Sequence, residues 1–184
     1  MKKPRREPLR TERMELWPVE ERWAGVLWEA AEASLAEVRP WMPWARRASA
    51  RETLAFCRAT EAGWADGRTF DFAWVEQGRV VGAGGIEFQD PDALRGEVGY
   101  WVRTDVSGRG LATEGAAALV RFGFDQVGLH RIELKAGTEN ARSRRVAEKL
   151  GFTLEAEGLR DAGLGAAGYY DCALYARLAT DPRV

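Results

Sequence analysis

The sequence contains few of the residues that build disulfide frameworks and metal centres. Only two of its 184 residues are cysteine and only one is histidine. Cys57 and Cys172 form no Cys-x-x-Cys pair, so we expect both thiols to be reduced packing groups. The single histidine, His130, excludes a histidine-rich metal site and argues against a Ser-His-Asp triad. We therefore expect no resident metal.

Excess charge and long apolar runs are also absent. The 27 basic and 28 acidic residues nearly cancel, so the chain has no global basic field of the kind that nucleic-acid binders carry. No apolar stretch reaches the roughly 18 residues of a membrane span, and residues 1–7 lack the apolar segment of a signal peptide. We expect a cytoplasmic protein with no direct contact to membrane or nucleic acid, in which any anionic ligand is held by a local site.

Enough apolar sequence is present for one folded domain. Apolar residues make up 46% of the chain, which suffices for a buried core at this length. We take residues 1–184 as a single domain, with residues 1–8 as a flexible basic arm because this segment is rich in charged residues.

Apolar spacing predicts about four helices. Four segments show the three- and four-residue period of an amphipathic helix or carry its start and stop signals: residues 20–38, 49–65, 112–127 and 140–150. Pro40 ends the first helix, and Ser49 with Glu52 forms a capping box that opens the second.

The same reading predicts a mixed, mostly antiparallel sheet of about six or seven strands. Three apolar runs separated by turn residues indicate an antiparallel meander: residues 70–76, 79–88 and 97–103. Residues 131–136 form a strand after a helical connection, which favours a parallel pair with right-handed crossover. Residues 152–157 and 169–178 would close the sheet as a hairpin around the glycine-rich stretch 158–168. The predicted fold class is α+β.

A glycine-containing loop, residues 106–112, precedes the third predicted helix. Gly108 and Gly110 permit close backbone approach, and a helix N-terminus offers unpaired N–H groups, so an anion such as phosphate could bind there. A simple tight turn explains the loop equally well. Leu111 stands where a P-loop requires Lys. A dinucleotide fingerprint would need Gly instead of Thr113 and remains the weaker alternative, with Glu133 imitating its ribose carboxylate.

Four motifs follow one another at fitting separations: Glu97-Val98-Gly99-Tyr100-Trp101-Val102, Gly108-Arg109-Gly110-Leu111-Ala112-Thr113-Glu114, Asn140-Ala141-Arg142-Ser143 and Glu148-Lys149-Leu150-Gly151-Phe152. In this order they resemble the GNAT superfamily of N-acetyltransferases, and most of all its branch of RimJ- and RimL-type ribosomal-protein acetyltransferases. The resemblance runs from about Leu9 to Leu178. It implies an acyltransferase that uses acetyl-CoA as co-substrate, transfers acetyl directly to an amine, needs no metal and forms a homodimer.

The resemblance also implies where acetyl-CoA lies. The parallel strands would splay apart near Val102 and Ala136, with pantetheine between them and paired to backbone groups of Val102 and Thr104. The pyrophosphate would be surrounded by the N–H groups of six consecutive residues: Gly108, Arg109, Gly110, Leu111, Ala112 and Thr113. Asn140 and Ser143 would approach the thioester. Related loops often carry Gln or Arg where Ser107 stands, and Arg109, Arg142 or Arg145 could compensate.

Ser143 is the candidate acid. Its spacing to Val146, Ala147 and Leu150 turns the hydroxyl inward, where it could also simply bond back to its own helix. The resemblance implies that Ser143 protonates the departing CoA thiolate. Other branches of the family carry Tyr at the position of Ala147.

Three carboxylates are candidates for the base: Glu97, Glu87 and Asp161. RimL-like proteins carry a base glutamate where this chain has Ala162 or Gly163. Glu97 is favoured, although it could simply pair with Arg95 or Arg160.

The resemblance places the acceptor pocket at Trp41, Met42 and Trp44, and we expect Glu87 to line it as well. Core packing would explain the aromatic segment equally well. Tyr169 and Tyr170 have the same two readings. A peptide α-amine titrates near pH 8 and lysine near 10.4, so an α-amine costs roughly 3 kcal/mol less to deprotonate. We expect a protein N-terminus, such as that of a ribosomal protein, as acceptor. The alternatives are a small amine (amino acid, polyamine or antibiotic) and a CoA-binding module without catalysis.

Overall fold

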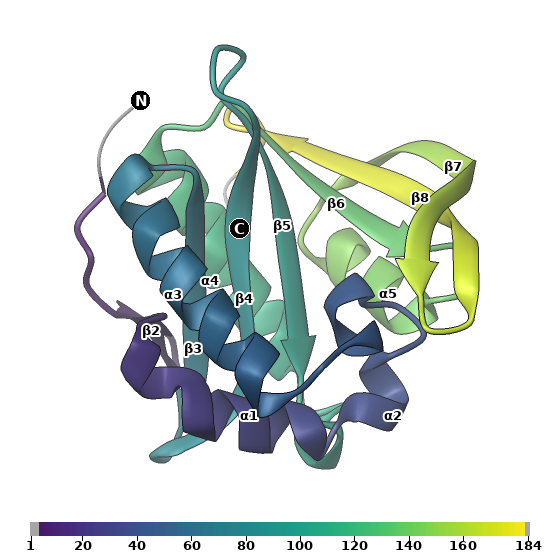
Figure 1. Ribbon diagram of the computed structural model, residues 1–184. Helices are drawn as coiled ribbons and strands as arrows, with labels where there is room; N and C mark the ends of the chain where they lie inside the picture. Colours follow the sequence, from purple (N-terminus) through teal and green to yellow (C-terminus); the bar gives the residue numbers. More distant parts are fainter. Residues whose placement is uncertain (1–3, 183–184) are drawn as a thin grey trace.

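One eight-stranded sheet forms the centre of the computed structural model, which describes residues 4–182 (Figure 1). Its strands are β1 (Leu9–Arg10), β2 (Glu15–Pro18), β3 (Thr69–Glu76), β4 (Arg79–Asp90), β5 (Arg95–Val102), β6 (Arg131–Gly137), β7 (Thr153–Gly165) and β8 (Gly168–Leu178). They lie in the order β1-β2-β3-β4-β5-β6-β8-β7, and only β5 and β6 are parallel among the described strands. The mixed α+β class and its parallel pair are confirmed.

The predicted count of six or seven strands was too low. The two extra strands, β1 and β2, are two and four residues long and precede the first helix. β2 pairs with β3 along four residues, from Glu15 opposite Val75 to Pro18 opposite Phe72. Strands this short show no measurable alternation in the sequence, because backbone pairing of β1 to β2 and of β2 to β3, and not side-chain periodicity, defines them.

The helical segments are η1 (Glu21–Trp23), α1 (Ala24–Glu32), α2 (Leu35–Val38), η2 (Pro43–Arg46), α3 (Ala50–Asp66), η3 (Thr104–Val106), α4 (Leu111–Phe122), η4 (Gly123–Val127) and α5 (Ala141–Lys149). The continuous helix predicted over residues 20–38 is wrong, because the chain turns at Ser34 between α1 and α2. The Ser34 hydroxyl donates to the Ala30 carbonyl and accepts from the Thr104 N–H, so it ties this turn to the end of β5.

Helix start and stop signals elsewhere are confirmed. Ser49 accepts a hydrogen bond from the Glu52 N–H at the start of α3, and Gly67 ends that helix with a φ of 69°. Asn140 accepts from the Ser143 N–H at the start of α5. These caps fix where α3 and α5 begin, and thereby the position of Ser143.

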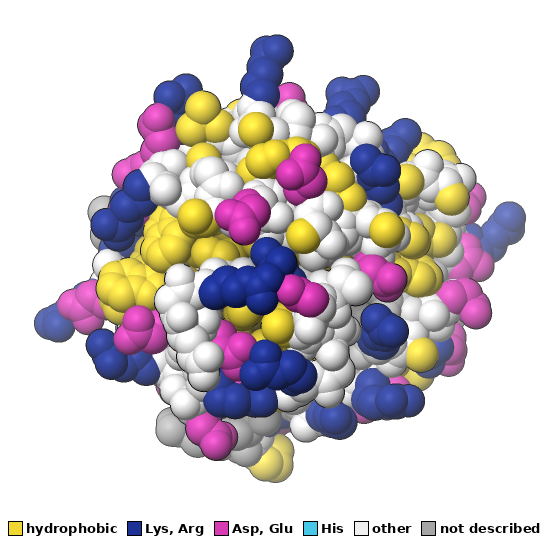
Figure 2. Space-filling view, turned by 90° about the horizontal axis from the view of Figure 1, so that it is seen from below, with side chains coloured by type: hydrophobic (Ala, Val, Ile, Leu, Met, Phe, Trp, Pro, Cys, Tyr) yellow, Lys and Arg dark blue, Asp and Glu magenta, His cyan; other side chains and the backbone are white. Residues whose placement is uncertain are grey.

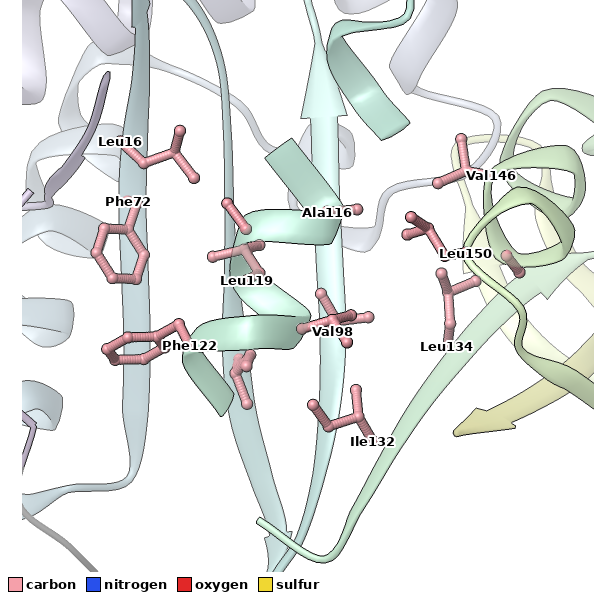
Figure 3. Packing of buried hydrophobic residues seen from close by; sticks show 14 of the residues in the cluster. Leu16, Phe72, Val98, Ala116, Leu119, Phe122, Ile132, Leu134, Val146 and Leu150 are labelled. Atoms are coloured by element: carbon pink, nitrogen blue, oxygen red, sulfur yellow. The ribbon is translucent and has the colours of Figure 1, made fainter. Parts of the chain in front are cut away.

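The helices cover both faces of the sheet. α1 and α3 lie in front of β3 to β5 in Figure 1, and α4 lies behind. Behind the sheet, Phe122 and Leu119 of α4 pack over Phe72 and Val98 in one continuous apolar cluster (Figure 3). A smaller cluster joins α1 and α3 to the other face of the sheet; its members are Val19, Leu27, Ala30, Cys57, Ala73, Val80 and Ala83. Strand alternation therefore sends Phe70, Phe72 and Trp74 to one face and Asp71 and Ala73 to the other.

The glycine-rich stretch predicted between the last strands is instead part of a long hairpin. β7 runs to Gly165 and β8 starts at Gly168, with register shifts after Leu154, Ala156 and Leu159. Gly158 and Asp161 have positive φ values of 70° and 53°, which allow the strand to bulge. The glycines thus bend a strand instead of opening a loop.

The first described residues contact the folded domain through Arg6. Arg6, inside the predicted basic arm, donates to the Val19 carbonyl at 3.0 Å and lies 3.4 Å from a Glu61 carboxylate oxygen. Residues 1–3 of that arm lie outside the described part of the chain. Among residues 4–182, no helix has the length and apolarity that crossing a membrane requires.

Candidate active site

The site begins where β5 and β6 part. Over the described residues these strands pair only from Arg95 opposite Arg131 to Glu97 opposite Glu133, and then they diverge (Figure 1). β5 continues to Val102, still paired with Gly82 of β4 on its other side. The β6-facing edge of β5 is therefore open beyond Glu97, and a ligand could form backbone hydrogen bonds there.

The predicted anion loop follows directly. Gly108 and Gly110 have φ values of 84° and 88°, a left-handed backbone that side chains disfavour. Gly110 is the N-cap of α4, and the first helical N–H with a partner belongs to Glu114, which donates to the Gly110 carbonyl at 3.1 Å. Helix geometry leaves the N–H groups of Leu111, Ala112 and Thr113 without intrahelical acceptors. Together with the positive end of the helix dipole, they form a cradle for an anion.

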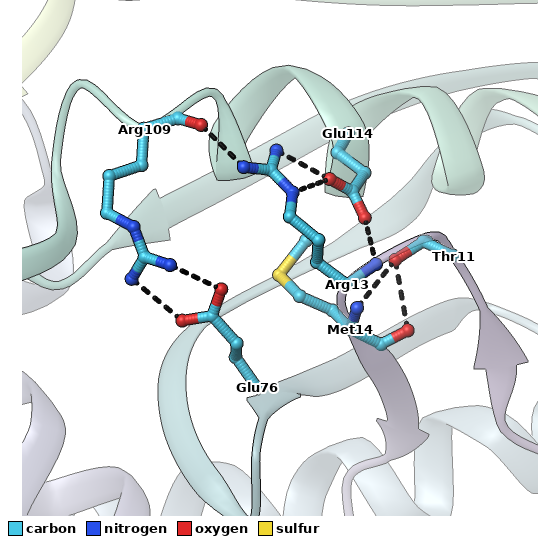
Figure 4. A network of polar contacts seen from close by, with 6 residues as sticks. All are labelled: Thr11, Arg13, Met14, Glu76, Arg109 and Glu114. Carbon is cyan, nitrogen blue, oxygen red and sulfur yellow. Dashed lines mark hydrogen bonds and ion pairs between the residues drawn. The ribbon is translucent and has the colours of Figure 1, made fainter.

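Ion pairs hold the back of this loop (Figure 4). Both guanidinium Nη atoms of Arg109 lie 2.8 Å from the carboxylate of Glu76, which is buried at the end of β3. Arg13 donates to the Arg109 carbonyl at 2.8 Å and to the Glu114 carboxylate at 2.7 Å. The Arg109 guanidinium therefore pairs with Glu76, so the part of Arg109 that could bind a phosphate is its backbone N–H.

The two backbone positions expected to pair with pantetheine differ in whether they are free to do so. The Thr104 N–H donates to Ser34 Oγ at 3.2 Å, and the Thr104 carbonyl accepts from the Ser107 N–H at 3.1 Å. Val102, in contrast, lies where the β6-facing edge of β5 is open. Arg142 is exposed and lies 3.8 Å from Glu37. The lower face, seen in Figure 2, mixes basic, acidic and apolar side chains. A bound anion would therefore depend on the local N–H groups more than on a broad basic surface.

Two cavities meet beside the open edge of β5. The first, of about 360 Å³, lies between β5, β6 and the β7–β8 hairpin, and we call it the splay cavity. The second, of about 410 Å³, lies between the sheet and the segments α1, η2 and α3, and we call it the sheet-face cavity. They share five lining residues, Met42, Pro43, Glu97, Gly99 and Tyr100.

Most of the predicted chemistry gathers around these cavities. Asn140, Ser143 and Trp41 line the splay cavity, and Trp44 and Glu87 line the sheet-face cavity. Met42 and Glu97 line both. The Tyr170 hydroxyl donates to the Trp41 carbonyl at 2.7 Å, so Tyr170 also fixes the wall of the splay cavity. Trp41 and Trp44 are thus both packing residues and lining residues.

Sequence reasoning missed the hydroxyl partner of Ser143. The Tyr100 hydroxyl lies 3.2 Å from Ser143 Oγ, and the Tyr100 ring stacks on Trp74 with centroids 6.1 Å apart. Burial raises the pKa of Tyr100 to about 12, against a smaller opposing effect of the Ser143 hydrogen bond. Tyr100 therefore stays protonated at neutral pH. The sequence held one signal for Tyr100: it follows the buried Val98 by two residues on the same strand, so both side chains point to the same face of the sheet.

The candidate bases occupy different places. Glu97 Oε2 lies 2.9 Å from Lys135 Nζ. Its ion-pair partner is therefore Lys135 and not Arg95 or Arg160, the two partners that the sequence suggested. The pair raises the pKa of Lys135. Among described carboxylates Glu97 alone lines both cavities, while Asp161 lines the splay cavity. Ala162 and Gly163, where the resemblance implied a base glutamate, also line the splay cavity and carry no carboxylate.

A further carboxylate, Asp71 on β3, was not anticipated. It lines the sheet-face cavity and accepts a hydrogen bond from the Thr60 hydroxyl at 3.2 Å. Burial, with a smaller contribution from the nearby Glu87 charge, raises the pKa of Asp71 to about 6. The sequence shows a polar residue between Phe70 and Phe72, and strand alternation predicts that it points away from their face of the sheet. Alternation does not predict whether that opposite face meets a cavity or solvent.

Comparisons with known proteins agree with this geometry. The family described as the acetyltransferase (GNAT) domain matches residues 13–153. YdaF of Bacillus subtilis is 29% identical over 116 residues, 62% of each chain. The ribosomal-protein-serine acetyltransferase of Escherichia coli is 30% identical over 112 residues, 58% of this chain and 59% of that protein. The matches thus span about three-fifths of these curated relatives.

Solved structures extend the likeness over nearly the whole chain. RimJ of Mycobacterium smegmatis, solved with CoA-disulfide, has a TM-score of 0.83 at 29% identity and covers 94% of this chain and 86% of its own. RimL, an acetyltransferase of ribosomal protein L7/L12 solved with coenzyme A, has a TM-score of 0.88 at 21% identity, with 94% and 98% coverage. The latter identity supports the fold alone. The chain belongs to the GNAT acetyltransferase family and resembles its RimJ and RimL members.

Proposed function

We propose that the protein transfers acetyl from acetyl-CoA to a primary amine, and that this amine is the N-terminal α-amine of a protein such as a ribosomal protein. The observation that carries the proposal is the open edge of β5, which leads from the Gly108–Gly110 cradle to the Ser143 hydroxyl. Family membership and the RimJ and RimL likeness support it. A ribosomal-protein acceptor implies a cytoplasmic location.

The described residues fit acetyl-CoA, which supplies an acetyl group activated as a thioester. The N–H groups of residues 108–113 would hold the pyrophosphate, and the free edge at Val102 would pair with pantetheine. Of the two backbone positions expected for pantetheine, Val102 is favoured because Thr104 already uses both its N–H and its carbonyl. Asn140 and Ser143, lining the splay cavity, would lie nearest the thioester.

Acyl transfer requires one proton to leave the amine and one to reach the departing thiolate. Ser143 would donate the second proton, and the neutral Tyr100 hydroxyl would hold Ser143 Oγ and re-supply its proton. Glu97 would take the proton from the amine, directly or through water, because it lines both cavities. Its ion pair with Lys135, at 2.9 Å, fixes the orientation of the Glu97 carboxylate.

The test is acceptor-dependent thiol release from acetyl-CoA, with the acetylated product identified by mass. A panel of ribosomal-protein N-terminal peptides is compared with amino acids, polyamines and aminoglycosides. Ser143→Ala should slow turnover by about 100-fold, the lower part of the range for general acids, because a thiolate with pKa near 8.5 is already a fair leaving group. Thr180→Ala, which removes an exposed hydroxyl outside both cavities, serves as the matched control.

The panel also separates the alternatives. Activity on small amines but not on peptides would replace the protein N-terminus by a small-molecule acceptor. Tight CoA binding without acetylation of any member would support a non-catalytic CoA-binding module, for which the missing glutamate at Ala162 and Gly163 is the motive.

We also propose that the protein forms a homodimer. β7 is the edge strand of the sheet, and the hairpin exposes Leu154 and Tyr169, which are 42% and 72% accessible. Exposed edges and apolar groups favour association. Sedimentation equilibrium tests this, and a monomer at micromolar concentration would contradict it.

A further inference from the structure

The sheet-face cavity has an entirely acidic charged lining. Glu52, Asp71, Glu87 and Glu97 line it, and no Lys, Arg or His is among its lining residues in the described part of the chain. The chain as a whole is balanced, with 27 basic and 28 acidic residues. Only Glu97 has an ion-pair partner among the described residues, Lys135, so three carboxylates face the cavity without a cation. A cavity of about 410 Å³ with this lining selects positively charged groups.

Strand register gives the cavity floor a direction. Gly99 of β5 lies opposite Gly85 of β4, and Gly85 lies opposite Asp71 of β3. Neighbouring strands are about 4.8 Å apart, so the backbone row from Gly99 through Gly85 to Asp71 spans about 10 Å. A Cβ at Gly99 would meet no atom within 4 Å, whereas a Cβ at Gly85 would collide with Asp71 Oδ1. Gly99 therefore leaves the β5 end of the row open, and the Asp71 carboxylate lies over Gly85, about one strand spacing from Gly99.

The flanks of this row also suit an organic cation. On one side Glu97 lies opposite Glu87, which adds a second line of negative charge. On the other side Trp101 packs against Trp44, with ring centroids 5.8 Å apart, and Phe56 and Trp44 reach the surface at the mouth. Aromatic faces attract ammonium and guanidinium groups, and they cover the methylene groups between two charges.

We propose that the acceptor carries a second cationic group, which binds between Asp71 and Glu87 while the reacting amine lies at the Tyr100 end of the cavity. This inference rests on the acetyl transfer proposed above and narrows its acceptor. The shared chemistry is an alkylammonium or guanidinium joined to the amine by an apolar spacer. Two sources could supply it, a linear diamine or a peptide with Lys or Arg close to its N-terminus.

The experiment measures kcat/KM for acceptor pairs that differ only in the second charge. One arm compares hexane-1,6-diamine with hexylamine. The other compares peptides that carry Lys or norleucine at the second position behind the same free N-terminus. We expect the dibasic member of at least one pair to be favoured by about tenfold or more, the scale of one charge-assisted hydrogen bond. The favoured arm identifies the source.

Variants assign the effect to the cavity. Glu87→Gln changes an exposed rim side chain and should bring the ratio within a pair close to one by lowering kcat/KM for the dibasic member. Asp71→Asn keeps an acceptor for the Thr60 hydroxyl and should do the same. Glu32→Gln, an exposed acid on α1 outside the cavity, should leave the ratio unchanged.

The possible failures are distinguishable. Equal kcat/KM within both pairs, with product formed from all four acceptors, would overturn this inference and leave acetyl transfer standing. A preference that survives both cavity variants would also overturn it, because the second charge would then bind elsewhere. Absence of any acetylated product from these and the earlier panel would instead remove the proposed function itself.

Discussion

Replacement of Tyr100 by Phe tests whether this residue acts through Ser143. The change removes one hydroxyl, whose described partner is Ser143 Oγ at 3.2 Å, and keeps the ring that stacks on Trp74. A hydrogen bond between neutral hydroxyls contributes about 0.5–1.5 kcal/mol. If that energy serves to hold Ser143 in the transition state, kcat should fall about 2- to 13-fold, since 1.36 kcal/mol corresponds to a factor of ten.

The magnitude alone does not separate a positioning role from a general loss of packing, so a double-mutant cycle is needed. Acetyl-CoA turnover is measured for Tyr100→Phe, Ser143→Ala and the double variant, with urea unfolding as a check on stability. We expect the double variant to be no slower than Ser143→Ala, because the Tyr100 hydroxyl has lost the group on which it acts. Equal slowing by Tyr100→Phe in both backgrounds would refute the coupling. An increase in KM for acetyl-CoA without a change in kcat would also refute it.

Three further predictions concern the loop and the buried acid. Gly110→Ala should destabilise the fold by about 1 kcal/mol and raise KM for acetyl-CoA, because Gly110 has a φ of 88°. The cost should come from the backbone and not from a clash, since the nearest described atom to an added Cβ is 3.4 Å away. Thermal unfolding with and without CoA checks this, and an unchanged KM would contradict the proposed anion cradle. Arg109→Met should also raise KM for acetyl-CoA, with kcat unchanged, because Glu76 would lose the partner that holds the loop; Glu76→Gln should match it, and a difference between them would mean that the guanidinium itself binds phosphate. Asp71→Asn should stabilise the protein at pH 7.5 by up to about 3 kcal/mol, as urea unfolding would show, since the folded pKa of Asp71 is about 6 against an ordinary 3.8.

The sign of the last effect follows from proton uptake. Because the folded state binds the Asp71 proton more tightly than the unfolded chain, wild-type stability should fall as pH rises from about 4 to 6. Above pH 6 the ionised carboxylate stays destabilising, so the advantage of Asp71→Asn is complete there and shrinks towards pH 4. Glu87 and the Cys57 thiol share this environment, and the Asp71 charge is one cause that raises the pKa of Cys57. An advantage of the variant that does not change with pH would contradict this account.

The sequence predicted those elements whose signals are local. Ser49 and Asn140 marked two helix starts, and the meander and crossover followed from apolar periods and turn residues. The errors fell where long-range pairing overrides local pattern. β2 forms because β3 offers a hydrogen-bonding edge, and β1 in turn pairs with β2. α1 ends near Ser34, whose side chain reaches the Thr104 N–H. β3 is far in sequence from β2, and Thr104 is far from Ser34.

The same distinction applies to the site. The loop at Gly108 and Gly110 and the hydroxyl of Ser143 carry their signals within short motifs, and the structure brings them to one end of the sheet. The Tyr100 hydroxyl and Asp71 depend instead on tertiary neighbours. The first needs α5 placed over β5, and the second needs α3 placed over β3. The alternating pattern predicts which face of the sheet Tyr100 and Asp71 point to, but not which helix packs on that face.

Asp71 links stability to acceptor choice. The Asp71 carboxylate lies under α3, and its one described side-chain hydrogen-bond partner is the Thr60 hydroxyl, so its charge lowers stability at neutral pH. It also requires glycine at position 85, because a Cβ there would collide with Asp71 Oδ1. An acid kept only for structure would be better replaced by an apolar residue of similar size. A bound cation would offset the burial of the charge, so the second positive group of the acceptor should stabilise the wild type more than Asp71→Asn. The preference for dibasic acceptors should therefore weaken as pH falls below about 6, where Asp71 becomes neutral. Selectivity that is constant from pH 5.5 to 7.5 would place the discrimination on Glu87 alone.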